Sequence, residues 1–176
     1  AADSVENEVL CARLYLANIE GSRPPPLPET LGLLPGDFAV GRRHLTIPRA
    51  AAVADAQDRT RAEAAYELLA PQKGIMGSVK LSSTDRSLGR LAVLKGDFQR
   101  AAQHFDDALT FLRRAGYRPE LAWTCSDYSE MLLDNGTPAE KAKAQHLQDG
   151  GLHIARDLGM KPLIERILRR REILRA

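Results

Sequence analysis

Two amphipathic periodicities in residues 82–115 constrain the fold of this chain more than any other feature. Apolar side chains recur at three- and four-residue steps on both sides of a Gly96-Asp97 pair, which is the spacing of one buried face on each of two helices. Gly96 can adopt the left-handed conformation that ends a helix, and Asp97 can accept the unpaired amides that begin the next one. The stretch predicts a helical hairpin, and one hairpin cannot bury both of its faces without neighbours.

Similar patterns precede and follow this hairpin, in residues 48–70 and 119–158. In the first of them, a Gln57-Asp58 pair separates the two helical periodicities. The three segments align on one alanine each, and these alanines are 39 and 43 residues apart: Ala62, Ala101 and Ala144. Because each alanine is expected where two helices cross, the chain is predicted to stack three hairpins side by side.

The third segment carries the strongest local signals for helix starts. Pro119 suits the first turn of a helix, and Thr137 with Glu140 forms a capping box. The second helix of this hairpin contains a Gly150-Gly151 pair, which costs about 1 kcal/mol per glycine relative to alanine. We therefore expect either that a neighbour packs closely on these glycines or that the helix bends there.

The remaining segments flank the three hairpins. Residues 1–21 predict an N-terminal helix, residues 22–47 a proline-rich loop with an irregular connection, and residues 162–174 a last amphipathic helix that caps the stack. The helical repeats then occupy residues 48–175 as one domain with a sizeable core. Since the chain of 176 residues does not begin with Met, it is expected to be a segment of a longer protein.

Composition and charge exclude several classes of protein. A net charge of +2, from 25 basic and 23 acidic residues, is too small to attract nucleic acid or an anionic membrane by bulk electrostatics. No window has the roughly 20 apolar residues that a membrane helix requires. Cys11 and Cys125 are far apart and form neither a disulfide framework nor a CxxC pair, which favours a reducing cytoplasm.

The central hairpin resembles the tetratricopeptide repeat, a helix-turn-helix unit of about 34 residues. Leu88 and Gly89 fall on the Leu-Gly pair of that family, and Gly96-Asp97 falls on its turn. The small, aromatic and small positions of the second helix are occupied by Ala101, Phe105 and Ala108. The resemblance implies an all-α fold, namely a right-handed α-α superhelix of about three hairpins with flanking helices.

Some positions depart from the family pattern. Asp85 stands where the family prefers a large aromatic residue, and Ala92 stands where it often has tyrosine. In the third hairpin, Gln148 takes the aromatic position. These departures lie at positions that the family resemblance assigns to helix packing.

Four phrases together are similar to the C-terminal helical-repeat region of large bacterial signalling ATPases: residues 33–37, 61–71, 88–92 and 155–162. That resemblance implies a sensor or scaffold segment of a regulator whose nucleotide-binding, LuxR-type DNA-binding or nucleotide-cyclase domains lie elsewhere. Its implied partner is a protein segment or a neighbouring domain of the same polypeptide, with a small-molecule effector as a further ligand.

No grouping of residues predicts catalysis, a cofactor or a bound metal. The four histidines lack the i, i+4 spacing of a helical metal site and are expected at the surface: His44, His104, His146 and His153. The Asp106-Asp107 pair is expected to be solvated, because adjacent helical residues point in different directions. Phosphate-binding glycine loops and nucleophile motifs are missing from the sequence. We therefore predict that the chain is not an enzyme.

The family resemblance implies a concave groove lined by the first helix of each hairpin. The outward-facing positions of the second and third hairpins are Arg86, Arg90, Val93, Trp123, Asp127 and Glu130. Trp123 is the expected anchor for a partner, because aromatic residues dominate the binding energy of interfaces. The alternative is that Trp123 fills the joint between the second and third hairpins.

A second hypothesis assigns nucleic-acid binding to the C-terminal helix. Its basic face consists of Arg166, Arg169, Arg170, Arg171 and Arg175. Basic side chains near a helix C-terminus are also favourable for electrostatic reasons alone, and this structural interpretation is the preferred one. Self-association is a third hypothesis, because an uncapped end of a helical stack exposes apolar surface.

Overall fold

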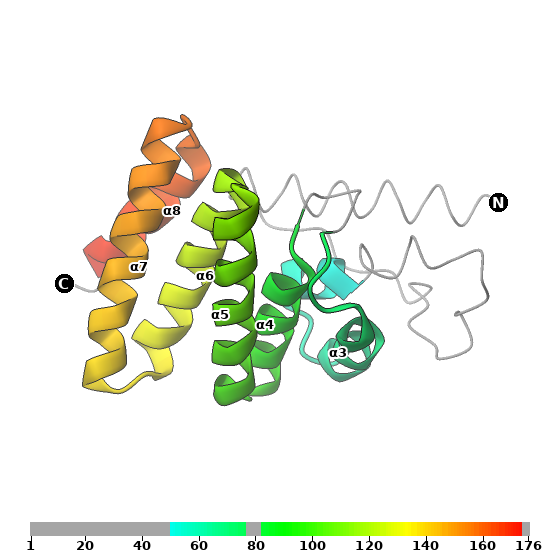
Figure 1. Ribbon diagram of the computed structural model, residues 1–176. Coiled ribbons are helices and arrows are strands. Elements are labelled where there is room, and N and C mark those ends of the chain that lie inside the picture. Colours follow the sequence, from blue (N-terminus) through cyan, green and yellow to red (C-terminus); the bar gives the residue numbers. More distant parts are fainter. Residues whose placement is uncertain (1–49, 77–81, 174–176) are drawn as a thin grey trace. The chain divides into compact units, whose positions relative to one another are not determined.

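The computed structural model describes residues 50–76 and 82–173, which are helical apart from short connections (Figure 1). Within these ranges the strand-like pairing is limited to one isolated antiparallel bridge between Met76 and Ser83. The predicted all-α class is confirmed. The helix expected over residues 1–21 and the connection expected over residues 22–47 lie outside the described residues.

The chain forms two compact units that divide within one helix. The N-terminal unit extends to His104, and the C-terminal unit begins at Phe105. The dividing helix is α5 (Phe98–Ala115). Its first turns therefore belong to the N-terminal unit and the remainder to the C-terminal unit.

A tight turn joins two short helices in the N-terminal unit. Residues 50–55 are helical, and the chain turns through Gln57, which has a positive φ of 54°. The Asp58 carboxylate then accepts hydrogen bonds from the backbone amides of the second and third residues after it, at 2.9 and 3.2 Å. Helix α3 (Ala62–Leu69) follows directly. The turn thus falls on the Gln57-Asp58 pair where the sequence predicted it.

Helix α4 (Thr84–Lys95) packs against α3 and ends at a left-handed glycine. It is preceded by a 3-10 turn, η2 (Ala70–Gln72). Gly96 has a φ of 80°, and its amide and the next one donate to carbonyls in the last turn of α4 at 3.0 Å each. The Asp97 carboxylate accepts the amide of Arg100 at 3.1 Å, at the start of α5. These bonds satisfy the last carbonyls of one helix and the first amides of the next, as the sequence predicted.

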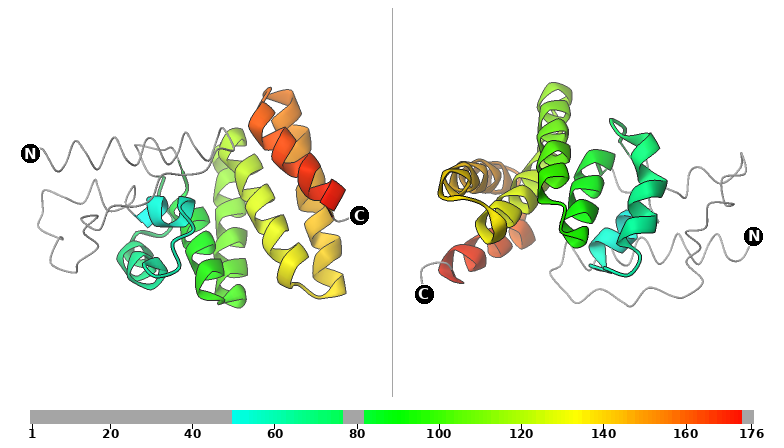
Figure 2. Two further views of the ribbon diagram at one scale, coloured as in Figure 1. Left: turned by 180° about the vertical axis from the view of Figure 1, so that it is seen from behind. Right: turned by 90° about the horizontal axis from the view of Figure 1, so that it is seen from below.

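Three helices follow α5 in the C-terminal unit: α6 (Arg118–Asn135), α7 (Pro138–Asp157) and α8 (Lys161–Ile173). Helices α6 and α7 pack against each other along their lengths, and α8 packs against α7 (Figure 2). Between α6 and α7, the Thr137 hydroxyl accepts the amide of Glu140 at 3.4 Å, and the Glu140 carboxylate accepts the amide of Thr137 at 2.7 Å. The predicted capping box is confirmed.

Helix α7 continues without a break through Gly150 and Gly151, and a neighbour packs closely on the second glycine. A Cβ atom at Gly151 would lie 3.1 Å from the Cβ of Cys125 and 3.3 Å from the carbonyl oxygen of Ala122, both on α6. It would also lie 3.8 Å from Cδ1 of Ile167 on α8. Gly151 therefore marks the point where α6, α7 and α8 converge, whereas a Cβ at Gly150 would meet nothing within 4 Å.

Each hairpin buries the same positions of its second helix. The aligned alanines have no exposed surface, and the residues four positions later are buried as well: Ala62 and Tyr66, Ala101 and Phe105, Ala144 and Gln148. Small side chains at such positions allow two helix backbones to approach closely. The alignment of the three segments therefore corresponds to a repeated pattern of burial.

Candidate functional site

The predicted groove residues of the second hairpin are largely committed to the N-terminal unit. Arg86 is buried, with 4% of its surface exposed. Arg90 pairs with the Asp55 carboxylate at 2.5 Å and donates to the carbonyl of Ala54 at 2.9 Å. These bonds connect α4 to the short helix of residues 50–55. Val93 is half-buried. The two arginines therefore differ from the outward-facing orientation that the sequence predicted for them.

A buried polar cluster joins α3, α4 and the first turns of α5. The Tyr66 hydroxyl lies 2.7 Å from Nε2 of His104, and Nδ1 of His104 lies 3.5 Å from a carboxylate oxygen of Asp85. The other carboxylate oxygen of Asp85 accepts the amide of Gly74 at 2.6 Å. Tyr66, His104 and Asp85 are each at most 9% exposed. Because buried polar groups are costly without partners, these contacts fix how the start of α5 lies on α3 and α4.

The burial of His104 corrects the expectation that the histidines lie at the surface. The signal that could have located this cluster is Asp85, a carboxylate at a helix position where the resembling family prefers an aromatic residue. A tyrosine hydroxyl on an imidazole that faces a carboxylate can transfer a proton. Here the bond between Tyr66 and His104 is itself buried. The arrangement supports a structural role.

In the C-terminal unit, Arg166 of α8 engages all three predicted groove residues of α6. Its guanidinium forms two bonds to the Glu130 carboxylate, at 2.8 and 2.7 Å, and one to Asp127 at 2.9 Å. The same group lies 5.7 Å from the ring centroid of Trp123, in cation–π geometry. Trp123 and Asp127 are each 7% exposed, whereas the side chain of Glu130 is 28% exposed. The structure therefore brings these three residues together around the side chain of Arg166, which belongs to the same chain.

Two further arginines of α8 also pair with acidic side chains. Arg170 bonds the carboxylate of Asp134 on α6, and Arg171 bonds Asp149 at 2.5 Å and Gln148 at 3.2 Å on α7. We call the set of carboxylates that receives these arginines the acidic face. It consists of Asp127, Glu130, Asp134 and Asp149.

These ion pairs weaken the hypothesis of nucleic-acid binding. Phosphate binding would require arginines to leave carboxylates of their own chain, and this applies to Arg166, Arg170 and Arg171. Arg169 is exposed, and Arg175 lies outside the described residues. The pairing supports the structural interpretation of the basic helix.

An exposed ionic contact links three helices elsewhere in the C-terminal unit. The Lys143 ammonium lies 3.0 Å from the Asp106 carboxylate and 2.8 Å from the Tyr128 hydroxyl, which donates to Asp106 at 3.1 Å. Burial raises the pKa of Tyr128. Burial alone would lower the pKa of Lys143, but bonds to Tyr128 and Asp106 outweigh it and raise that pKa. Asp106 is half-exposed, as predicted, and it joins α5 to α6 and α7.

Cys125 is a buried free thiol. Its residue is 5% exposed, and burial raises the pKa of the thiol from 9.0 to about 11, although the charge of Arg113 acts in the opposite direction. The thiolate is the nucleophilic form, and a thiol with this pKa is protonated at neutral pH. Cys11 lies outside the described residues.

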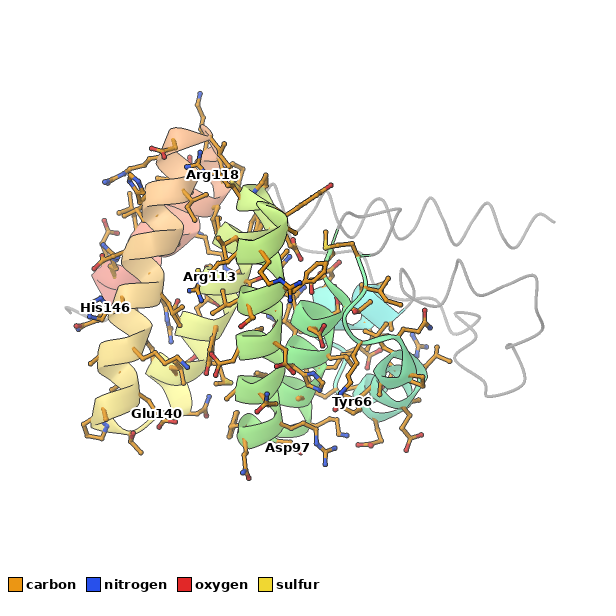
Figure 3. The ribbon with its side chains drawn as sticks, viewed as in Figure 1. Tyr66, Asp97, Arg113, Arg118, Glu140 and His146 are labelled. Carbon is orange, nitrogen blue, oxygen red and sulfur yellow. The ribbon has the colours of Figure 1, made fainter. Side chains whose placement is uncertain are left out.

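The two histidines of α7 are exposed, as the sequence predicted. His146 lies on α7, farther along the helix than Glu140 of its first turn (Figure 3). His153 is also exposed, and its Nε2 lies 3.7 Å from the carboxylate of Asp157. His44 lies outside the described residues.

None of the helices that the structure describes combines the length and the apolar character needed to span a membrane.

Comparisons with protein-family models, with curated proteins and with solved structures found no match.

Proposed function

We propose that the chain is a tetratricopeptide-like helical-repeat segment that binds a protein segment or a neighbouring domain of the same polypeptide and is not itself an enzyme. The proposal includes a right-handed superhelix of about three hairpins, a cytoplasmic location, and a place in a bacterial signalling or transcription regulator. A small-molecule effector is the second class of ligand. The repeated burial of one alanine in each hairpin supports the repeat architecture.

The observation that carries the proposal is the engagement of α6 by a guanidinium. Trp123, Asp127 and Glu130 hold Arg166 through a two-bond fork, a third hydrogen bond and a ring face. Aromatic side chains and arginine are the residue types that dominate interface binding energies. A surface with these contacts has the chemistry required to hold a helical or extended protein segment.

The test is a peptide-display selection against the purified full chain, followed by calorimetry on the selected peptides. Trp123 is the sole tryptophan of the chain, so its fluorescence reports occupancy of this surface. We expect peptides of micromolar affinity whose binding shifts the tryptophan emission. Glu130→Arg should weaken binding about tenfold, because it removes an acceptor and adds a repulsive charge.

The matched control is His146→Ala, which changes an exposed residue of α7 that is not one of the four carboxylates of the acidic face. This variant should bind the selected peptides with unchanged affinity. The proposal fails if no peptide, purified neighbouring domain or small-molecule effector binds, or if Glu130→Arg and His146→Ala behave alike. Light scattering on the same samples tests self-association, the remaining class of partner.

A further inference from the structure

We propose that the acidic face is a docking site for an arginine-rich amphipathic helix of a partner protein, and that α8 occupies this site as an internal competitor. This inference rests on the proposed function and specifies the partner class for the same surface. It follows from how α8 is attached and from which side chains attach it.

Few apolar contacts hold α8 in place. Its buried residues are Leu163 and Ile167, whereas Leu168 and Ile173 are 38% and 60% exposed. Helix α6, by contrast, buries eleven residues. Elements with little buried apolar surface open locally at a lower free energy than the rest of a domain. We therefore expect α8 to detach from α7 while α6 and α7 remain folded.

The polar attachment of α8 can be replaced by equivalent groups from another helix. The side chains of Arg166, Arg170 and Arg171 are 31%, 24% and 25% exposed, so their pairs with Glu130, Asp134 and Asp149 lie at the rim of the contact. The exception is Asp127, which also pairs with Arg166 and whose side chain is 4% exposed. Two of their partners are mostly exposed, with side-chain exposures of 55% for Asp134 and 69% for Asp149. Ion pairs at a wet rim contribute little net stability and weaken with salt.

The contacts of α8 define the chemistry of the competing helix. Its two apolar anchors, Leu163 and Ile167, are four residues apart. Its arginines lie three, seven and eight residues after Leu163, at Arg166, Arg170 and Arg171. This spacing places all five on one side of a helix. Lysine cannot replace the first arginine, because a two-bond fork on Glu130 and a flat group near Trp123 both require a guanidinium.

The junction before α8 permits such a displacement. Only Leu158, Gly159 and Met160 separate α7 from α8, and Gly159 has a positive φ of 66°. Glycine populates both signs of φ, so this junction can change conformation without steric cost from a side chain. The inferred displacement of α8 would require Gly159 to change conformation and the bond from the Met160 amide to the Ala155 carbonyl, at 2.8 Å, to open.

The experiment uses the full chain and a labelled synthetic peptide with the sequence of residues 161–173. The receptor is a variant in which Leu163→Asp and Ile167→Asp detach α8, and fluorescence anisotropy measures the affinity. We expect the peptide to bind this variant at least about tenfold more tightly than the wild-type chain, and to bind less tightly as salt rises. A control peptide with glutamine in place of the three arginines should not bind.

Equal binding of both peptides, or no binding to the variant while its circular dichroism remains helical, would overturn the inference. Dimerisation of the wild-type chain by exchange of α8, without peptide binding, would assign the acidic face to a second copy and also overturn it. If the variant does not fold, hydrogen exchange on the wild-type chain decides. The peptide should then accelerate exchange in α8 while α6 stays protected, and an unchanged α8 contradicts the inference.

The outcome separates this inference from the proposed function. If display selection yields peptides that bind at the acidic face but are not arginine-rich, the proposed function stands and the choice of partner class is wrong. If no protein segment, neighbouring domain or effector binds in any assay, both are wrong.

Discussion

The two polar clusters of this protein use similar residue types at very different burial. In the N-terminal unit, Tyr66, His104 and Asp85 are at most 9% exposed. The Tyr66 hydroxyl is hydrogen-bonded to His104, and Nδ1 of His104 lies 3.5 Å from the Asp85 carboxylate. In the C-terminal unit, Arg166 and Glu130 meet at a rim where their side chains are 31% and 28% exposed. A buried polar group that loses its partner retains the full cost of desolvation, whereas a rim group regains water. The first cluster is therefore expected to hold the fold, and the second to be exchangeable.

The largest effect should come from breaking the buried cluster. His104→Ala removes the partner of the Tyr66 hydroxyl and leaves a cavity beside Asp85, so the free energy of unfolding should fall by about 2–4 kcal/mol. Urea unfolding followed by circular dichroism measures the loss. His146→Ala is the matched control, because this histidine of α7 is exposed, and it should change stability by less than about 0.5 kcal/mol. Equal losses in the two variants would show that His104 is not a structural partner.

Unfolding at alkaline pH tests whether the Cys125 thiol is buried in the interior of the C-terminal unit. The thiol of Cys125 ionises near its ordinary pKa of 9.0 when the chain is unfolded, but its pKa is about 11 when folded because the thiol is buried. The unfolded state therefore loses this proton first as pH rises from 9 to 11. The free energy of unfolding should fall across that window by about 2–3 kcal/mol from this group.

The control for this effect is Cys125→Ala. The raised pKa values of Tyr128 and Lys143 also make stability fall above about pH 10, and both contributions persist in the variant. Denaturant unfolding at several pH values should give a steeper decline for the wild-type chain than for Cys125→Ala. Parallel curves would mean that the thiol is not desolvated in the folded state.

The close packing at Gly151 provides a smaller and more local test. Gly151→Ala places a methyl group 3.1 Å from the Cβ of Cys125, so helices must separate and the free energy of unfolding should fall by about 1–2 kcal/mol. Gly150→Ala is the matched control, since its new methyl group meets nothing within 4 Å. Helix propensity predicts that the control gains up to about 1 kcal/mol. The same sign in both variants would contradict the close packing at Gly151.

The smallest effect is expected at the rim. Arg171→Gln should cost about 0.5–1 kcal/mol at low salt and less at high salt, because the Asp149 side chain with which it pairs is 69% exposed. Arg169→Gln, at an exposed position of the same helix, should leave stability within about 0.5 kcal/mol of the wild type. Thermal unfolding at two salt concentrations measures both. A loss as large as that of His104→Ala would remove the contrast between the two clusters.

Local features of the fold were predictable because they depend on neighbours in the chain. The Gly96 cap, the Asp97 side-chain bond and the Thr137-Glu140 capping box each use residues within a few positions of one another. Apolar periodicity likewise locates a buried helix face without reference to what covers it. These signals predicted the all-α class.

The polar contacts of the candidate site were less predictable, because they join residues far apart in the chain. Arg166 meets Glu130 across 36 positions, and Tyr66 meets His104 across 38. Nothing local distinguishes a basic helix face that binds phosphate from one that pairs with carboxylates of the same chain. The assignment of Arg166 to nucleic acid in the alternative hypothesis, and of His104 to the surface, came from this ambiguity.

The sequence by itself located the helices of the described residues to within a few positions and indicated which side of each is apolar, since caps, turns and periodicity act over a few residues. Only the tertiary structure decided which polar groups pair, that α6, α7 and α8 pack together at Gly151, and that arginines of α8 bind the carboxylates of α6. Those outcomes depend on distances in space between side chains that packing brings together. The types of residue and their spacing along the sequence do not specify these distances.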